Sequence, residues 1–160
     1  MTRAVTSVVL TFALALWAGG AIWLFVSVSK LFAIDHRTAA AIAPSFFQAF
    51  NRYQLVLGII ACAAALVLWR SDRRKASALP LACVAGAMIL VLAIFQVTSR
   101  LETLRGNGEA TGMQFKQLHG LSMVLYLGTT LLTALALGSL SWARVSEHRP
   151  AAGGTATPGR

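Results

Sequence analysis

The residue with the clearest potential for chemistry is a histidine inside a long apolar segment. His119 precedes Met123 by four positions, so a helix would place an imidazole nitrogen and a thioether sulfur on one face. These groups can ligate copper or a haem iron, which makes His119 and Met123 the candidate metal ligands, and haem or copper the candidate cofactors. A lone pair is weak evidence, because methionine in an apolar helix usually fills space. The sequence alone therefore assigns no cofactor.

Residues suited to acid–base or nucleophilic catalysis are scarce in this sequence. The long apolar segments contain no Asp or Glu, and the sequence shows no Ser-His-Asp set and no paired carboxylates. Because these residues are scarce, we lean against an enzyme, and the sequence indicates no catalytic residue. The lack of an acidic residue within the apolar segments also argues against a proton-driven transporter, since such transporters usually carry one.

A group of polar side chains forms a second candidate, a polar site. Helical spacing puts the polar residues that follow His119 on the same stripe, and polar groups in lipid tend to face other helices or a cavity. Residues near the ends of two other apolar segments should meet this stripe at the same, non-cytoplasmic membrane face. The candidate polar site consists of His119, Ser122, Tyr126, Gln96, Asn51 and Tyr53. It could open outward as a small binding site, or it could only join the helices by hydrogen bonds.

In both interpretations the imidazole of His119 should face the bundle, within reach of Gln96 or of the segment that begins at Asn51. A polar ring turned toward lipid would leave its nitrogen groups unpaired, and this costs free energy. Partners on neighbouring helices would satisfy those groups.

Cysteine and glycine residues in the apolar segments indicate packing more than chemistry. Cys62 and Cys83 lie in separate segments without a CxxC motif, so we expect them to be structural. Gly19 and Gly20, next to Trp23, suggest a large side chain beside a close backbone approach. Small residues also recur at four-residue spacing, which permits close packing between helices or between copies of the chain.

Four stretches without Asp, Glu, Lys or Arg form the elements that must position these residues. They are residues 4–29, 53–69, 76–99 and 117–143. Roughly 20 helical residues span a ~30 Å hydrocarbon core, and helices leave few backbone groups unpaired in lipid. We therefore predict an all-α fold, a polytopic integral membrane four-helix bundle. Its helices should cover about residues 5–28, 53–69, 77–98 and 118–142.

The segments between these helices differ in character. Residues 31–52 contain an amphipathic piece, Ala39–Phe50, which we expect at the membrane interface. Residues 102–113 hold three glycines and should form a flexible loop. We assign residues 1–148 to one transmembrane domain. Residues 149–160, which are rich in Ala, Gly, Thr and Pro, should form a disordered tail.

Composition and charge indicate that the lipid bilayer is the main partner. Hydrophobic residues make up 57% of the chain and charged residues 12%, against about 25% charged residues in soluble domains. The net charge of +9 comes from basic residues between the apolar segments, where they can meet anionic lipid head groups. No basic face interleaved with aromatic residues is evident, so we expect no nucleic-acid partner.

The distribution of basic residues also predicts an orientation. Four crossings place both termini and residues 70–75 on one side, which carries Arg3, Arg70, Arg73, Arg74, Lys75, Arg144, Arg149 and Arg160. The other side carries Lys30, Arg37, Arg52, Arg100, Arg105 and Lys116. Because basic residues favour the cytoplasmic side, above all in short loops, both termini should be cytoplasmic. We expect a multi-pass protein of the plasma membrane.

Three segments resemble a known family. They are Leu16–Gly20, Pro44–Phe47 and Phe115–Ser122, and their order is similar to that in the uncharacterised four-helix membrane proteins typified by transmembrane protein 205. The resemblance covers about residues 5–143, and the most specific part is the Phe-x-x-Leu-His-x-x-Ser pattern around His119. An asparagine that the family pattern often has one turn after that serine is replaced here by Tyr126.

The resemblance implies a four-helix bundle and a relation to membrane proteins of copper handling and haem-dependent porphyrin oxidation. Fold does not determine function, and the family has no agreed activity. We therefore expect a binding or accessory role in handling a small molecule or metal at the membrane. The alternatives are a haem- or copper-binding redox protein that uses His119, and a structural module that forms homo-oligomers.

Overall fold

The structure, a computed structural model, is a bundle of four long helices. It describes residues 2–71 and 78–147, with side chains described for residues 3–71 and 78–142. The helices are α1 (Thr2–Ile34), α2 (His36–Ser71), α3 (Ala78–Gly106) and α4 (Met113–Glu147), and the described residues contain no strand. The all-α fold is thereby confirmed. The predicted tail, residues 149–160, lies outside the described residues.

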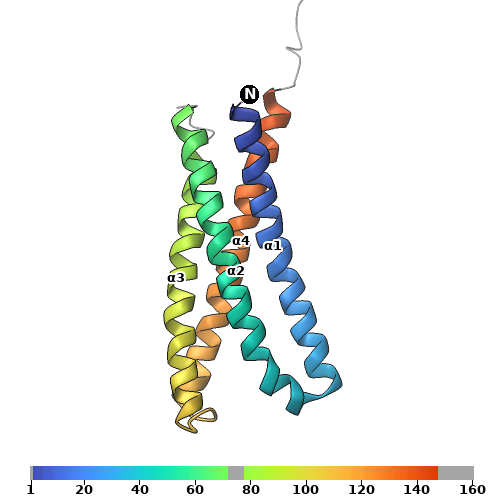
Figure 1. Ribbon diagram of the computed structural model, residues 1–160, viewed down its shortest axis with the longest axis vertical. Coiled ribbons are helices and arrows are strands. Elements are labelled where there is room, and N and C mark those ends of the chain that lie inside the picture. The colour runs from blue at the N-terminus through green and yellow to red at the C-terminus, as the bar shows by residue number, and fades with distance from the viewer. Residues whose placement is uncertain (1, 72–77, 148–160) are drawn as a thin grey trace, which may run out of the picture.

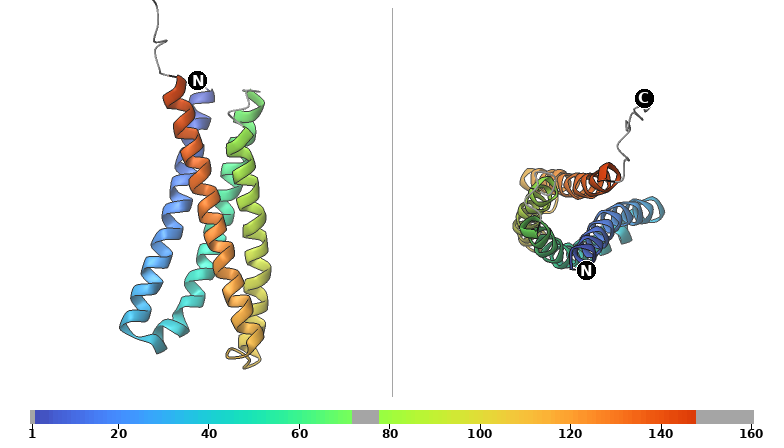
Figure 2. Two further views of the ribbon diagram at one scale, coloured as in Figure 1. Left: turned by 180° about the vertical axis from the view of Figure 1, so that it is seen from behind. Right: turned by 90° about the horizontal axis from the view of Figure 1, so that it is seen from above.

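The four helices run up and down and follow one another around the bundle (Figures 1 and 2). Two antiparallel hairpins, α1–α2 and α3–α4, form the closest pairs, while α2 packs on α3 and α1 contacts α4. Both side views show the α1–α2 hairpin diverging from the α3–α4 hairpin toward the end that holds their two short connections. The helices are therefore packed together in one half of the bundle and spread apart in the other.

The helices are longer than the charge-free stretches predicted, because those stretches mark the apolar zone and not the ends of the helices. The expected interfacial piece, Ala39–Phe50, is the first part of α2 and is continuous with its transmembrane part, with Pro44 inside the helix. Asp35 separates α1 from α2 and caps α2, since its carboxylate accepts hydrogen bonds from the Arg37 amide and the Thr38 hydroxyl. The loop between α3 and α4 is shorter than the predicted loop at residues 102–113, because α3 continues to Gly106.

Those residues turn the chain from α3 into α4. Gly108 lies there with a φ of 78°, a left-handed conformation that glycine adopts at little cost. The amide of Glu109 donates a hydrogen bond to the Leu104 carbonyl at 2.8 Å, which satisfies one of the free carbonyls at the end of α3.

Large apolar side chains cover much of the outer surface of the bundle. All four helices are long and apolar enough to cross a membrane. Their inward faces bury residues such as Leu14, Trp17 and Val91, while Ile89 is 67% exposed and Val124 is 66% exposed. Lipid, unlike water, can cover such a surface without a free-energy cost, so the chain is an integral membrane protein that spans the bilayer with four helices.

Candidate functional site

A chain of polar side chains crosses the interior of the bundle. On the α1–α2 side, the indole Nε1 of Trp17 donates to Oε1 of Gln54 at 3.4 Å. The amide Nε2 of Gln54 then donates to Oδ1 of Asn51 at 3.2 Å, and the phenol of Tyr126 donates to the same oxygen at 2.5 Å. Trp17, Gln54, Asn51 and Tyr126 are all buried. We call these residues, together with Thr98, the polar core.

Asn51 is the hub of the polar core. Its amide Nδ2 donates to the Thr98 hydroxyl on α3 at 3.3 Å, while its carbonyl oxygen accepts the bonds from Gln54 and Tyr126. The five residues therefore join all four helices. No buried side-chain nitrogen or oxygen among the described residues lacks a hydrogen-bond partner. Because each of these buried groups has a hydrogen-bond partner, the polar core stabilises the bundle.

Aromatic rings surround the phenol of Tyr126 and separate it from lipid. The ring centroids of Phe25, Phe47 and Phe50 lie 6.1, 5.4 and 6.3 Å from that of Tyr126. Phe25 comes from α1 and the other two from α2, so the rings fill the space between the two hairpins. Apolar surroundings strengthen the hydrogen bond from Tyr126 to Asn51, because no water competes for either group.

The hydroxyl groups along the inner face of α4 bond to their own helix. Ser122 donates to the His119 carbonyl at 2.7 Å, and Thr129 and Thr133 donate to carbonyls three to four residues earlier. All three side chains are buried. They are satisfied locally and add no interhelical link.

The structure brings together only part of the predicted polar site. Asn51, Tyr126 and Ser122 are buried, whereas Tyr53, between Asn51 and Gln54 in the sequence, is exposed and donates to the Leu16 carbonyl of α1. Gln96 and His119 are exposed, and among the described hydrogen bonds none joins either side chain to the polar core. For Gln96 the reason is helical phase, since residues two apart lie about 200° apart on a helix and Thr98 takes the inward position.

The position of His119 has a different cause. His119 and Tyr126 share a stripe on α4, because seven residues make nearly two full turns. Near the start of α4, the α1–α2 hairpin has diverged from the α3–α4 hairpin (Figures 1 and 2). The imidazole instead stacks on Phe115, with ring centroids 6.2 Å apart and planes 4° from parallel. Arg105 covers the Phe115 ring, with Cζ 5.6 Å from the centroid.

The predicted metal ligands do not form a metal site in the described part of the chain. No three His, Cys, Asp or Glu side chains come together there in a group that could hold a metal. His119 is exposed and Met123 is half-buried on the same helix. His119 and Met123 lie one turn apart on α4 and stay predicted ligands.

The sequence analysis missed Trp17 and Thr98 as members of the polar core. Both residues carry a polar group within an apolar segment of the sequence. A buried indole N–H needs an acceptor, and a hydroxyl within an apolar helix needs a partner. Cys62 is half-buried and Cys83 is buried, and both thiols are free.

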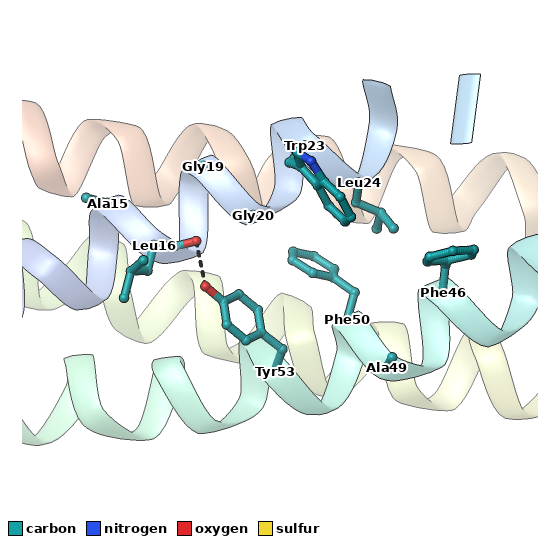
Figure 3. A pocket seen from close by; sticks show the side chains of 10 residues that line it. All are labelled: Ala15, Leu16, Gly19, Gly20, Trp23, Leu24, Phe46, Ala49, Phe50 and Tyr53. Atoms are coloured by element: carbon teal, nitrogen blue, oxygen red, sulfur yellow. Dashed lines mark hydrogen bonds between the residues drawn. The ribbon is translucent and has the colours of Figure 1, made fainter. Parts of the chain in front are cut away.

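A groove lies between α1 and α2. It has a volume of about 490 Å³ and opens on the outer surface of the hairpin. It is lined by Ala15, Leu16, Gly19, Gly20, Trp23, Leu24, Phe46, Ala49, Phe50 and Tyr53 (Figure 3). The Tyr53 hydroxyl donates to the Leu16 carbonyl at 3.0 Å, so this polar group is already satisfied. Apart from the indole N–H of Trp23, the remaining lining side chains are apolar.

Two glycines on α1 shape the floor of this groove. A Cβ atom on Gly20 would lie 2.9 Å from Cε1 of Tyr53 and 3.3 Å from Cε2 of Phe50, so only glycine lets these rings pack against α1. A Cβ atom on Gly19 would meet nothing within 4 Å. Gly20 thus permits the helix contact, and Gly19 leaves open space beside it.

The fold and the apolar outer surface define the class of the protein, a multi-pass membrane protein built as a four-helix bundle. The chain belongs to the family described as domain of unknown function DUF4149, whose match covers residues 12–108. That segment contains the whole groove and every residue of the polar core except Tyr126. No curated protein and no solved structure matches the chain.

Proposed function

We propose that the protein is a membrane-embedded binding protein that holds the hydrocarbon chain of a lipid in the groove between α1 and α2. The groove itself carries this proposal. Its volume of about 490 Å³ lies within the range of roughly 300–1,000 Å³ that is typical of ligand pockets. The polar side-chain groups in its lining are the indole N–H of Trp23 and the Tyr53 hydroxyl, which already has a partner.

The polar core supports an apolar ligand over a polar one. A polar molecule inside the bundle would have to break hydrogen bonds that join all four helices, such as the one between Tyr126 and Asn51. A hydrocarbon chain in the groove breaks none of them. This proposal therefore retains the expected role of handling a small molecule and moves its site from the His119 end of α4 to the α1–α2 hairpin.

The groove also fits the dimensions of one lipid leaflet. Its α1 residues run from Ala15 to Leu24, nine positions that rise ~14 Å. One leaflet contributes about half of a ~30 Å hydrocarbon core. An extended acyl chain can thus lie along the whole groove. We further propose a plasma-membrane location with both termini in the cytoplasm, and a relation to the family typified by transmembrane protein 205.

The test is to fill the groove. In Gly19→Leu the new side chain points into open space, so it should occupy the groove without disturbing the bundle. Gly138→Leu is the matched control, because Gly138 on α4 also has nothing within 4 Å of a Cβ position and lies outside the groove. Lipid retained by the detergent-purified protein would be measured by native mass spectrometry.

Wild type and Gly138→Leu should retain one lipid per chain, and Gly19→Leu should lose most of it. Equal retention by all three proteins would overturn the proposal. A second copy of the chain is the competing occupant of the groove. If wild type forms a dimer without bound lipid, and Gly19→Leu dissociates that dimer, the groove is an interface of a homo-oligomer. This result would contradict a lipid site.

A further inference from the structure

The groove leads toward an unpaired basic side chain. Lys30 follows Trp23 by seven positions on α1, so it lies on nearly the same face of the helix, ~10 Å nearer the α1–α2 connection. It is exposed, and no described carboxylate forms an ion pair with it. The nearest acidic residue in sequence, Asp35, already accepts hydrogen bonds from the Arg37 amide and the Thr38 hydroxyl.

Lys30 also lies at the depth where lipid head groups are found. It ends the charge-free stretch of α1, and lysines at such positions extend their ammonium groups to the interface. Trp23 is exposed and lines the groove (Figure 3), and in sequence it lies between Ala15 and Lys30 on α1. Tryptophan commonly occupies the border between hydrocarbon and head groups. The order along α1 is therefore charge, aromatic ring and apolar groove, which matches head group, glycerol region and acyl chain.

From these positions we infer that the lipid in the groove is an anionic phospholipid, and that Lys30 binds its phosphate. This inference rests on the proposed function and names its ligand. Charge complementarity selects the head group. A zwitterionic lipid carries a cation beside its phosphate, so its head group has no net charge. An anionic lipid has a net negative charge, which the ammonium group of Lys30 can neutralise. The distance agrees as well, since Lys30 and Ala15 are separated by ~22 Å along α1, about the length of a phosphate, a glycerol and an extended acyl chain.

The test compares phosphatidylglycerol with phosphatidylcholine of the same acyl chains. Purified full-length protein would be equilibrated with equimolar mixtures of the two, and the bound lipid quantified by native mass spectrometry. One basic residue near a membrane surface favours an anionic lipid by about fivefold. Wild type should show a preference of this size for phosphatidylglycerol. Lys30→Gln should bring it close to equal binding, and Lys30→Arg should retain it.

Lys116→Gln is the matched control, because Lys116 is also exposed but lies at the start of α4, on the other hairpin. It should keep the preference of wild type. A preference that survives in Lys30→Gln, or that falls equally in Lys116→Gln, would overturn the inference.

The two proposals fail in different ways. Equal binding of both lipids by wild type, with loss of both in Gly19→Leu, would refute the role of Lys30 and leave the groove as a lipid site. Binding that Gly19→Leu does not change would refute the groove itself.

Discussion

The phenol of Tyr126 on α4 donates a hydrogen bond to Oδ1 of Asn51 on α2 at 2.5 Å. The two residues belong to different hairpins, and 75 positions separate them in the chain. The bond therefore joins the α1–α2 hairpin to the α3–α4 hairpin, and these hairpins diverge toward the end that holds their short connections (Figures 1 and 2). Because Asn51 also bonds to Gln54 and Thr98, its loss would affect more partners than the loss of Tyr126.

Removing these two groups should cost different amounts of stability. Tyr126→Phe deletes one interhelical hydrogen bond and should lower the free energy of unfolding by about 0.5–1.5 kcal/mol. Asn51→Ala leaves the Tyr126 hydroxyl and the Gln54 amide without their partner, and should cost about 1–3 kcal/mol. Unfolding by denaturing detergent in mixed micelles would measure both. An Asn51→Ala variant as stable as Tyr126→Phe would contradict the role of Asn51 as the hub.

The glycine contact in the core can be tested with a matched pair of alanine substitutions. A Cβ atom on Gly58 would lie 2.9 Å from Cη2 of Trp17 and 3.0 Å from Sδ of Met88. Gly58→Ala should therefore overpack the core and destabilise it by about 1–3 kcal/mol. Gly138→Ala, which meets nothing within 4 Å, should not destabilise the protein. Thermal unfolding in detergent would compare them, and equal stability would argue against close packing at Gly58.

Substitution of His119 should have little effect. The side chain is exposed, and its described ring contact is with Phe115 on the same helix. His119→Gln should change the free energy of unfolding by no more than about 0.5 kcal/mol. The visible absorption spectrum of the purified protein provides the second measurement. A Soret band in wild type that disappears in a folded His119→Gln variant would show that His119 is a haem ligand after all.

The cap at the start of α2 should respond to acid. The Thr38 hydroxyl, followed by the backbone amides of Thr38 and Arg37, holds the pKa of Asp35 below its ordinary value of 3.8. A carboxylate whose pKa is lower in the folded chain stabilises the fold fully above about pH 5 and loses that effect as the pH falls below 3.8. Amide NMR shifts of Arg37 and Thr38 should titrate with a midpoint below 3.8. Asp35→Asn, which keeps a capping oxygen, should abolish the titration, and a midpoint at or above 3.8 would contradict the cap.

The proposed orientation predicts where reporter fusions will lie. Eight basic residues on the side of the termini, against six on the other, favour cytoplasmic termini. Reporters fused after Ser77 and at the C-terminus should both report the cytoplasm. A reporter fused after Gly108, between α3 and α4, should report the opposite side. An external signal from either of the first two reporters would contradict the proposed orientation. Lys30 would then lie at the cytoplasmic leaflet.

The sequence was sufficient to predict the fold class. Four long charge-free stretches can satisfy their backbone groups in lipid only as helices, whatever their neighbours are, so the prediction needed no knowledge of packing. The sequence did not predict where the helices begin and end. Charged residues such as Arg52 mark the edge of the apolar zone, but they do not stop a helix, and α2 continues through Arg52 and Pro44 to its cap at Asp35.

The site was predicted only in part, because it depends on how the helices are arranged. Helical spacing put Tyr126 on a polar stripe of α4, and the place of Asn51 near the start of the second apolar segment put it at the same membrane face, where polar groups need partners. The same spacing put His119 on the stripe of Tyr126, but in the structure Tyr126 is buried and His119, nearer the start of α4, is exposed. The groove beside Gly19 likewise exists only where α1 and α2 meet at their observed distance. Local sequence determines which face of a helix is polar, whereas the relative positions of the helices decide what that face meets.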